Sequence, residues 1–250
     1  MDVKTAGRTV ELFEAFARVQ TPLSLAELGR ELDVPSSSCF NLVGALQNRG
    51  YLYSIGTRRR IYPTRKLFEV ASLIVAREPV VASVEDLLMG LRDKTRETVI
   101  FGARQGEKAI YLSVIEGPQT IRYTGHAGDL KPLHSSAAGK ALLSTLPKGD
   151  LDKLVAGLKL EKMTDNTIVD LDALRANLAL VETRGYTETR GENVADVMAI
   201  AMPIRIDGSV YALVVAGPMQ RFDANFEQNL EALRETHAQI LAVHARGRPF

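Results

Sequence analysis

Apolar residues recur at helical spacing in the first part of the chain. The segment "TVELFEAFARV" places Val10, Phe13 and Ala17 on one face of a helix. The pattern stops before Thr21-Pro22, where proline favours a break. We therefore predict an amphipathic helix that begins near Arg8.

Two further segments of this kind follow, separated by a proline-containing break at 33–35. "LSLAELGREL" has Ser24 as its N-cap and Glu27 three residues later, which is the spacing of a capping box. "SSSCFNLVGALQNRG" has a buried stripe, with Ser36 or Ser37 as its cap and Gly50 as its stop. The pattern predicts a helix-turn-helix, although a plain helical hairpin stays open from these residues alone.

A strand-like pattern comes directly after these helices. Residues 51–54 and 60–64 alternate around a glycine-containing turn, so we expect a β-hairpin and, with the helices, a winged helix-turn-helix. Arg58, Arg59 and Arg60 then lie at the tip and on the return strand of the wing. Wing arginines meet phosphate when the preceding helix enters the major groove. A solvated surface is the alternative, and the context favours contact with DNA.

Polar side chains at the start of the third helix are candidates for direct contact with DNA. Serine hydroxyls bind phosphates or base edges, and asparagine pairs with adenine through two hydrogen bonds. We expect Ser36 to act mainly as a cap and the serines and asparagine after it to act as contacts. The predicted DNA-binding residues are Ser36, Ser37, Ser38, Phe40, Asn41, Thr57, Arg58, Arg59 and Arg60.

The pattern changes after residue 64 and indicates a second domain. A helical segment over 64–77 is followed by Pro79 and another helix over about 80–94. Groups of strands with helices between them then argue for an α+β domain. We expect strands near 98–103, 109–115, 120–123, 197–206 and 209–216, and helices near 136–145, 148–156, 170–184 and from about 224 onward.

Composition supports two globular domains. The chain has 250 residues, 46% of them hydrophobic, without low-complexity tracts or repeats. Its net charge of +1 is uneven: residues 1–66 hold ten Lys and Arg against six Asp and Glu, whereas the rest hold 21 against 24. Contact with a polyanion is thus expected in the N-terminal part. No stretch reads as a membrane span or signal peptide, so we expect a cytoplasmic protein.

Several kinds of chemistry are disfavoured. One cysteine, Cys39, excludes an internal disulfide, and we expect it to pack rather than to sense redox state. The four histidines are scattered, so no metal or other cofactor is expected. Gly139-Lys140 lacks the remainder of a phosphate-binding loop, and Ser136 lies four residues from Lys140 rather than three. His134 near the serines reads as structural, which argues against an enzyme.

From "LSLAELGRELDVPSSSCFNLVGALQNRGYL" onward the chain resembles the IclR (isocitrate lyase regulator) family of bacterial transcription factors. "IEGPQTIRY", "LKPLHSSAAGKALLSTLP", "TDNTIVDLDALRANLALVETRGY" and "ALVVAGPMQRF" match segments of that family in the same order. The resemblance implies a winged helix-turn-helix over 1–66, a linker helix over 67–79 and a GAF-like effector-binding domain with an antiparallel sheet over 80–250. It also implies a homodimer or homotetramer.

The resemblance also implies a small-molecule pocket in the second domain. Small residues in "SSAAG" let a ligand approach N–H groups at a helix start, which suits an anionic group. The residues expected to bind the effector are Tyr123, Lys131, His134, Ser136, Ala137, Ala138, Thr189, Val197, Ala199, Val214 and Ala216. For Val214 and Ala216, ordinary sheet core is the alternative.

Departures from the family refine this expectation. Relatives that bind small keto acids tend to carry polar side chains where this chain has Thr189, Ala199, Val214 and Ala216, so we expect a roomier, less polar pocket. Lys131 replaces an apolar residue and could pair with a carboxylate, although a lysine also snorkels to solvent. The combination suggests an organic acid with an apolar, for example aromatic, body.

Taken together, these observations predict a DNA-binding regulator. Its partners would be double-stranded operator DNA, read as inverted repeats, and a small organic-acid effector, with repression as the default. Relatives often carry Lys and Arg at the positions of Ser36 and Asn41, so the grip on the DNA backbone is expected to shift to the wing. The alternative is an enzyme that uses the second domain's pocket and keeps the first domain for protein contacts.

Overall fold

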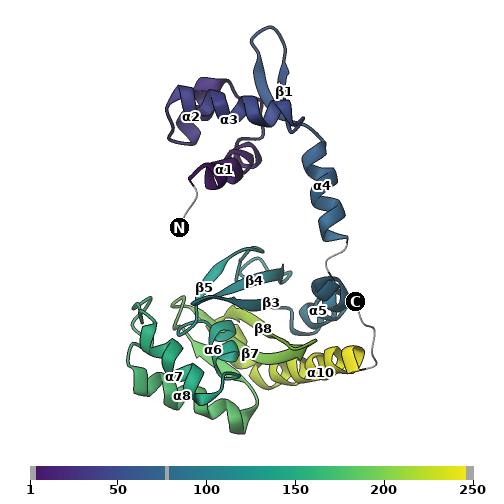
Figure 1. The fold of residues 1–250 in the computed structure, drawn as a ribbon. Coiled ribbons are helices and arrows are strands. Elements are labelled where there is room, and N and C mark those ends of the chain that lie inside the picture. The colour runs from purple at the N-terminus through teal and green to yellow at the C-terminus, as the bar shows by residue number, and fades with distance from the viewer. Residues whose placement is uncertain (1–3, 77–78, 246–250) are drawn as a thin grey trace. The chain divides into compact units, whose positions relative to one another are not determined.

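The computed structural model describes residues 4–76 and 79–245. Contacts within the chain divide it into two compact units, Met1–Glu78 and Pro79–Phe250 (Figure 1). The predicted linker helix over 67–79 includes residues 77 and 78, which lie outside the described residues. Residues 1–3 and 246–250 also lie outside them.

The first unit begins with three helices, α1 (Lys4–Val19), α2 (Leu25–Glu31) and α3 (Ser36–Asn48). The predicted capping box at the start of α2 is confirmed, since the Ser24 backbone N–H donates to Glu27 over 2.7 Å and the Glu27 N–H donates to Ser24 Oγ over 3.3 Å. Helix α3 ends before Gly50, whose φ of 74° is readily adopted by glycine. The apolar stripes of the three helices pack into one core around Leu12, Leu28 and Val43.

A two-stranded wing completes this unit. Strand β1 (Leu52–Ile55) pairs antiparallel with β2 (Arg60–Pro63), and the predicted hairpin is confirmed. A bridge between Leu23 and Ile61 ties the wing to the segment before α2. Helix α4 (Lys66–Val75) follows the wing and has no buried residue among those described in it.

The second unit is built on one six-stranded antiparallel sheet with the order β5-β4-β3-β8-β7-β6. The strands are β3 (Thr98–Gln105), β4 (Lys108–Ile115), β5 (Leu130–Pro132), β6 (Thr187–Arg190), β7 (Val197–Ile206) and β8 (Ser209–Pro218). Alternate residues of the central strands face opposite sides, so one sheet supports two separate cores.

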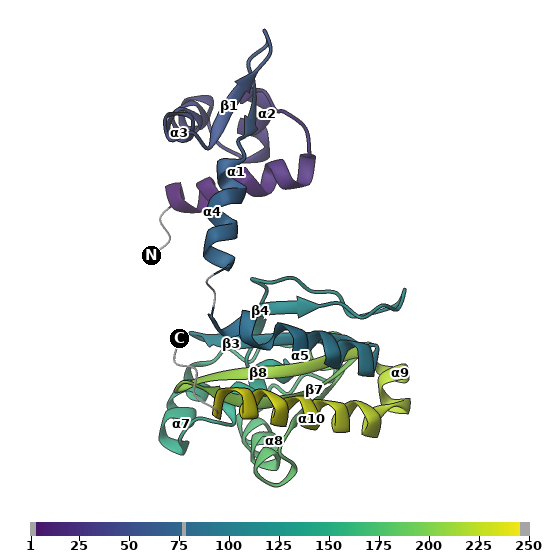
Figure 2. The same ribbon diagram turned by 90° about the vertical axis from the view of Figure 1, so that its right-hand side faces the viewer.

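Helices cover both faces of this sheet. Helices α5 (Pro79–Thr95) and α10 (Phe226–Ala245) lie side by side on one face, as Figure 2 shows. The other face packs against α6 (Ala137–Leu143), α7 (Lys148–Gly157) and α8 (Leu171–Arg184), and α9 (Met219–Ala224) joins β8 to α10. Asp170 caps the start of α8, and Gly185 ends it with a φ of 77°, which explains the glycine of the "RGY" element.

Most of the predicted elements are present, but the strand expected at 120–123 is absent. That prediction is wrong, because this segment is irregular. Ile121 is exposed, so the alternation of apolar and polar residues in this segment does not reflect one buried and one exposed face of a strand. The Tyr123 carbonyl instead accepts a hydrogen bond from Thr98 Oγ1 over 2.5 Å, which fixes the segment beside the sheet without pairing. The short strands β5 and β6 were not predicted.

Candidate nucleic-acid interface and ligand pocket

Helix α3 presents a polar face to the outside of the first unit. Cys39, Val43 and Leu46 form its buried stripe. Ser37 and Asn41 lie one helical turn apart on the opposite face, where both are exposed. The other predicted contacts at the helix start, Ser36, Ser38 and Phe40, are exposed as well. The fold thus gathers the predicted residues of α3 at one accessible surface.

The cap expected at Ser36 is wrong. Pro35 is the N-cap of α3, and no side chain caps the helix there. Proline fixes the entry into the helix through its backbone geometry, which leaves the Ser36 hydroxyl outside a capping role. Cys39 is fully buried, and burial raises the pKa of its thiol, so it is a packing residue in this core.

The three wing arginines do not share one environment. Arg58 and Arg59 lie with Thr57 in the exposed turn between β1 and β2, and Arg59 has a φ of 46°. Arg60 is half-buried, and its Nη1 donates to the Pro22 carbonyl over 2.8 Å and lies 3.2 Å from Glu27 Oε2. Arg60 therefore connects the wing to α2, whereas the other two side chains reach outward.

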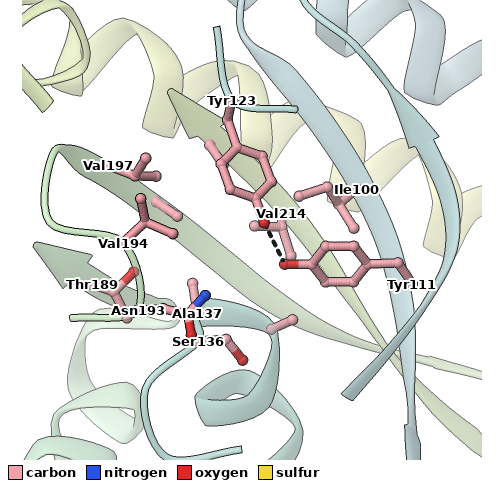
Figure 3. A pocket seen from close by; sticks show the side chains of 13 residues that line it. Ile100, Tyr111, Tyr123, Ser136, Ala137, Thr189, Asn193, Val194, Val197 and Val214 are labelled. Atoms are coloured by element: carbon pink, nitrogen blue, oxygen red, sulfur yellow. Dashed lines mark hydrogen bonds between the residues drawn. The ribbon is translucent and has the colours of Figure 1, made fainter. Parts of the chain in front are cut away.

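A pocket in the second unit lies between the start of α6, the sheet and the β6–β7 loop (Figure 3). Its wall contains most of the residues that the sequence suggested, and adds four that it did not. The predicted lining residues are Tyr123, Ser136, Ala137, Ala138, Thr189, Val197, Ala199, Val214 and Ala216, and the additional ones are Ile100, Tyr111, Asn193 and Val194. All of these side chains are uncharged.

The pocket is small in this structure. Its volume is about 30 Å³, which is roughly the space of one water molecule. The rings of Tyr111 and Tyr123 occupy the space beside the small residues, and their hydroxyl oxygens lie 3.5 Å apart (Figure 3). Burial raises the pKa of Tyr111 above its usual range, so this phenol stays a neutral hydrogen-bonding group.

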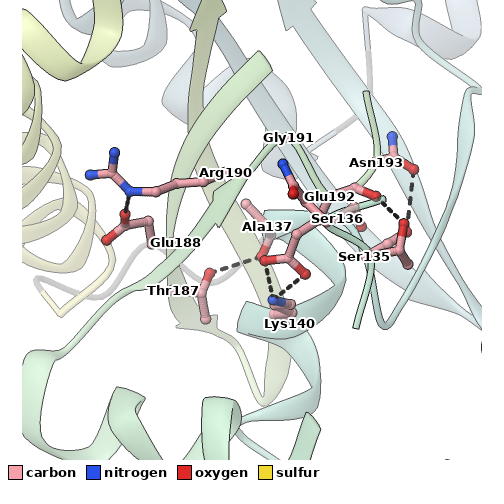
Figure 4. A network of polar contacts seen from close by, with 12 residues as sticks. Ser135, Ser136, Ala137, Lys140, Thr187, Glu188, Arg190, Gly191, Glu192 and Asn193 are labelled. Carbon is pink, nitrogen blue, oxygen red and sulfur yellow. Dashed lines mark hydrogen bonds and ion pairs between the residues drawn. The ribbon is translucent and has the colours of Figure 1, made fainter. Parts of the chain in front are cut away.

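A polar network holds the β6–β7 loop against α6 (Figure 4). Lys140 Nζ, on the fully buried α6, lies 2.7 Å from both carboxylate oxygens of Glu192. Thr167 Oγ1 donates to the Glu192 carbonyl over 2.7 Å, and Thr164 Oγ1 donates to the Gly191 carbonyl over 2.6 Å. The threonines of the "TDNT" segment thus fix the loop that carries Asn193 into the pocket wall.

Burial shapes the chemistry of this ion pair. It lowers the pKa of Lys140 and raises the pKa of Glu192, against the attraction between the two groups. The Lys140 ammonium group is fully buried against Glu192 and is not part of the pocket wall. It is a positioning group for the loop at 191–194.

Two predicted effector residues lie outside the pocket wall. Lys131 Nζ is 3.1 Å from Asp129 Oδ2 and lies over the Tyr111 ring. Its pKa is raised because Tyr123 and Asp129 outweigh the opposing effect of burial. His134 is buried with Nε2 3.0 Å from the Glu161 carbonyl, and burial lowers its pKa. Both side chains thus have partners within the protein.

Ser136 lines the pocket but serves the backbone. Its Oγ accepts the Gly139 N–H over 3.1 Å as the N-cap of α6 and donates to the Pro132 carbonyl over 2.6 Å. Both hydrogen bonds engage the Ser136 hydroxyl with the backbone, so this serine does not support the alternative prediction of an enzyme with a serine nucleophile. Among the residues that the structure describes, no group of three His, Cys, Asp or Glu side chains could hold a metal ion.

Sequence reasoning missed four pocket residues for identifiable reasons. Ile100 and Tyr111 lie on β3 and β4, and a register shift between Phe101 and Gly102 decides which side chains face the pocket. Asn193 and Val194 belong to an irregular loop whose place depends on the Lys140–Glu192 pair. A lysine within the apolar stretch "AAGKALL" was the available signal for such a buried pair.

Models of two protein domains match this chain. The domain described as "Bacterial transcriptional regulator IclR C-terminal" matches residues 73–242, and the "IclR helix-turn-helix domain" matches residues 5–56. The HTH-type transcriptional repressor AllR of Klebsiella pneumoniae is 30% identical over 220 residues, which cover 87% of this chain and 81% of AllR. The HTH-type transcriptional regulator KdgR of Escherichia coli is 25% identical over 223 residues, 88% of this chain and 85% of KdgR.

Solved structures share the fold along nearly the full chain. The crystal structure of IclR from Thermotoga maritima superimposes with a TM-score of 0.80 at 24% identity, covering 96% of this chain and 98% of that one. An IclR homologue from Microbacterium hydrocarbonoxydans, solved in complex with 4-hydroxybenzoate, gives a TM-score of 0.76 at 22% identity, covering 97% and 100%. In the described part of this chain, no helix has the length and apolar character of a bilayer span.

Proposed function

The chain belongs to the IclR family of bacterial transcriptional regulators, and we propose that its first unit binds operator DNA through α3 and the wing while its second unit binds a small organic acid. The observation that carries the DNA proposal is the exposed polar face of α3, which lies in one compact unit with the exposed arginines Arg58 and Arg59. A recognition helix in the major groove with a wing over the backbone uses both surfaces.

The roles within this interface divide by chemistry. We assign Ser37, Ser38 and Asn41 to contacts with base edges or phosphate, because all three are exposed on α3. Thr57, Arg58 and Arg59 are assigned to the DNA backbone. We give Arg60 a supporting role, because its guanidinium already binds the Pro22 carbonyl and Glu27.

The pocket would bind an acid through neutral hydrogen-bond donors, because no charged side chain lines it. Ala137 and Ala138 would contribute backbone N–H groups from the first turn of α6, where such groups have no partner within the helix. Asn193 Oδ1 accepts a hydrogen bond from Ser135 Oγ over 3.3 Å, so its NH2 group remains for a ligand. Ile100, Val194 and their apolar neighbours would contact the body of the acid. The complex of the Microbacterium homologue with 4-hydroxybenzoate favours an aromatic acid as the first probe.

Binding of such an acid requires the pocket to open. A volume of about 30 Å³ does not hold an aromatic ring. Tyr123 lies in the irregular segment after β4, so its displacement breaks no strand or helix. The other irregular part of the wall, the loop with Asn193 and Val194, is held by the Lys140–Glu192 pair. We infer that the ligand selects an open arrangement of this segment, and that this arrangement changes affinity for DNA by differential binding.

A homodimer is the proposed assembly. Helix α4 exposes Phe68, Leu73, Ile74 and Val75, all of them 63–68% accessible. A helix with such a surface gains stability when another apolar surface covers it. A second copy of the chain would also supply the second recognition helix that an inverted repeat needs. Sedimentation analysis of the protein and of Leu73→Glu tests this assembly, which the loss of the larger species in the variant would support.

Two titrations test the two parts of the proposal. Gel shifts with DNA upstream of the protein's own gene, against excess non-specific competitor, test operator binding. Thermal melting with 4-hydroxybenzoate and related acids tests the pocket, since a ligand bound to the folded state raises the melting temperature. Ala216→Leu should fill the pocket and abolish this rise while DNA binding persists.

Lys131→Met tests whether Lys131 leaves Asp129 to pair with the acid, and unchanged affinity would exclude that pairing.

A further inference from the structure

The recognition helix carries no charged side chain. Residues 36–48, "SSSCFNLVGALQN", contain neither Lys, Arg, Asp nor Glu. Arg49 follows directly, but its Nη1 donates back to the Ala45 carbonyl over 3.2 Å. Gln47, the long amide of the helix, donates to Ser54 on the wing over 3.0 Å. The groups left on the accessible face are therefore short hydroxyls, the ring of Phe40 and the amides of Asn41 and, two turns later, Asn48.

The ring of Phe40 is unusual for such a surface. It is 65% exposed, although a phenyl ring of this size is normally buried in a folded domain. The residues on either side of it differ in role, since Cys39 packs into the core and Asn41 faces outward. Burial of the ring against an apolar group of the DNA would remove this exposed area from water.

Base pairs differ in what they offer to these groups. Guanine is read mainly by Arg or Lys, and cytosine N4 donates to Glu or Asp, so an uncharged helix lacks the common readers of a G·C pair. Adenine pairs with Asn through N6 and N7, and the thymine methyl accepts an apolar contact such as a phenyl ring. Serine hydroxyls bind either kind of base pair and do not change this balance.

We propose that α3 reads A·T base pairs in the operator half-site, with Asn41 bound to an adenine and Phe40 packed against a thymine methyl group. This inference rests on the proposed DNA binding and adds the sequence class that the helix recognises. The wing arginines contribute affinity to any sequence through phosphate, whereas these two side chains supply the discrimination.

The test uses duplexes selected by the full-length protein from a random library. In the selected site, single thymines are replaced by deoxyuridine, which removes only the methyl group, and single adenines by 7-deazaadenine, which removes the N7 acceptor. We expect one deoxyuridine position to weaken binding about fourfold, the value of one buried methyl group. One 7-deazaadenine position should weaken it by about fivefold or more.

Two variants assign these effects to the two residues. Phe40→Ala should lose the sensitivity to deoxyuridine and keep that to 7-deazaadenine, and Asn41→Ala should show the reverse. Both side chains are exposed, so the variants should fold as the parent does. Selected sites with G·C pairs at the sensitive positions, or equal sensitivity in the parent and both variants, would overturn the inference while leaving DNA binding intact. Selection that enriches no duplex would overturn the proposed DNA binding, and this inference with it.

Discussion

Arg60 Nη1 lies 3.2 Å from Glu27 Oε2, so the third arginine of the wing is held by the acidic residue of the capping box of α2. The same nitrogen donates to the Pro22 carbonyl over 2.8 Å. Three adjacent arginines thus divide into two exposed side chains and one that joins the wing to the helix-turn-helix. This division leads to distinct expectations for neighbouring substitutions.

Replacement of Arg58 and Arg59 by Ala should weaken DNA binding across all sequences. Each lost phosphate contact lowers the slope of log K against log salt by about 0.9, so the double variant should lose about 1.8. Arg60→Ala is the matched comparison: it should cost on the order of 1 kcal/mol of stability in the first unit and leave the salt slope nearly unchanged. A slope change in Arg60→Ala equal to that of a single tip variant would place its side chain on phosphate instead.

Glu27 should make the first unit sensitive to acid. The hydrogen bond from the Ser24 backbone N–H is the main cause that lowers the pKa of Glu27 below its usual 4.5. A carboxyl group with a depressed pKa contributes stability above its unfolded pKa, and this contribution is lost as the pH falls through the folded value. Glu27→Gln should therefore show weaker hydrogen-exchange protection of α2 at neutral pH than the parent. The two proteins should converge in acid, and a constant difference at all pH values would contradict this account.

The buried pair Lys140–Glu192 should behave as a unit. Lys140→Met leaves the mostly buried Glu192 carboxylate without its partner, and Glu192→Gln leaves a fully buried ammonium group. Each single variant should cost about 3–5 kcal/mol in urea unfolding of the second unit. The double variant Lys140→Met with Glu192→Gln should cost less than the sum of the two single costs, because neither charge is left unpaired. Additive costs would show that the two groups are not energetically coupled.

Gly139 should resist substitution although it lies inside a helix. A Cβ atom there would come within 2.4 Å of the Leu133 Cα atom, so Gly139→Ala must displace the backbone beside the pocket. Gly90→Ala in α5 is the control, because a Cβ atom there meets nothing within 4 Å. The control should gain up to about 1 kcal/mol from helix propensity, whereas Gly139→Ala should lose stability. Equal urea midpoints for the two variants would contradict the close packing of α6.

Local rules predicted much of this fold from sequence. The capping box of Ser24 and Glu27, the stop at Gly50 and the hairpin after α3 follow from short spacings that backbone chemistry fixes. The family resemblance located most of the pocket wall. Non-local relationships were not accessible: the contact of Arg60 with Glu27 spans 33 residues, and the pair of Lys140 with Glu192 spans 52.

The size of the pocket also could not be predicted from the sequence pattern. Small residues such as Ala199 and Ala216 suggested open space, because each removes side-chain volume from the wall. The space depends equally on Tyr111, whose ring direction follows from the register of β4 beside β3. Small wall residues alone therefore do not predict the volume of the pocket, because the orientation of the aromatic rings opposite them also determines it.

The outward face of α3 as the DNA-binding surface is the central claim, and a gel-shift titration with Gly44→Glu tests it most directly. Gly44 lies three residues after Asn41, and a Cβ atom there meets nothing within 4 Å, so the variant should fold normally. Gly90→Glu adds the same charge in the second unit as a control. We predict that the parent and the control shift a selected duplex specifically and that Gly44→Glu does not, because its carboxylate would face phosphate and base edges. Failure of the parent to bind any duplex, or equal binding by Gly44→Glu, would contradict the claim.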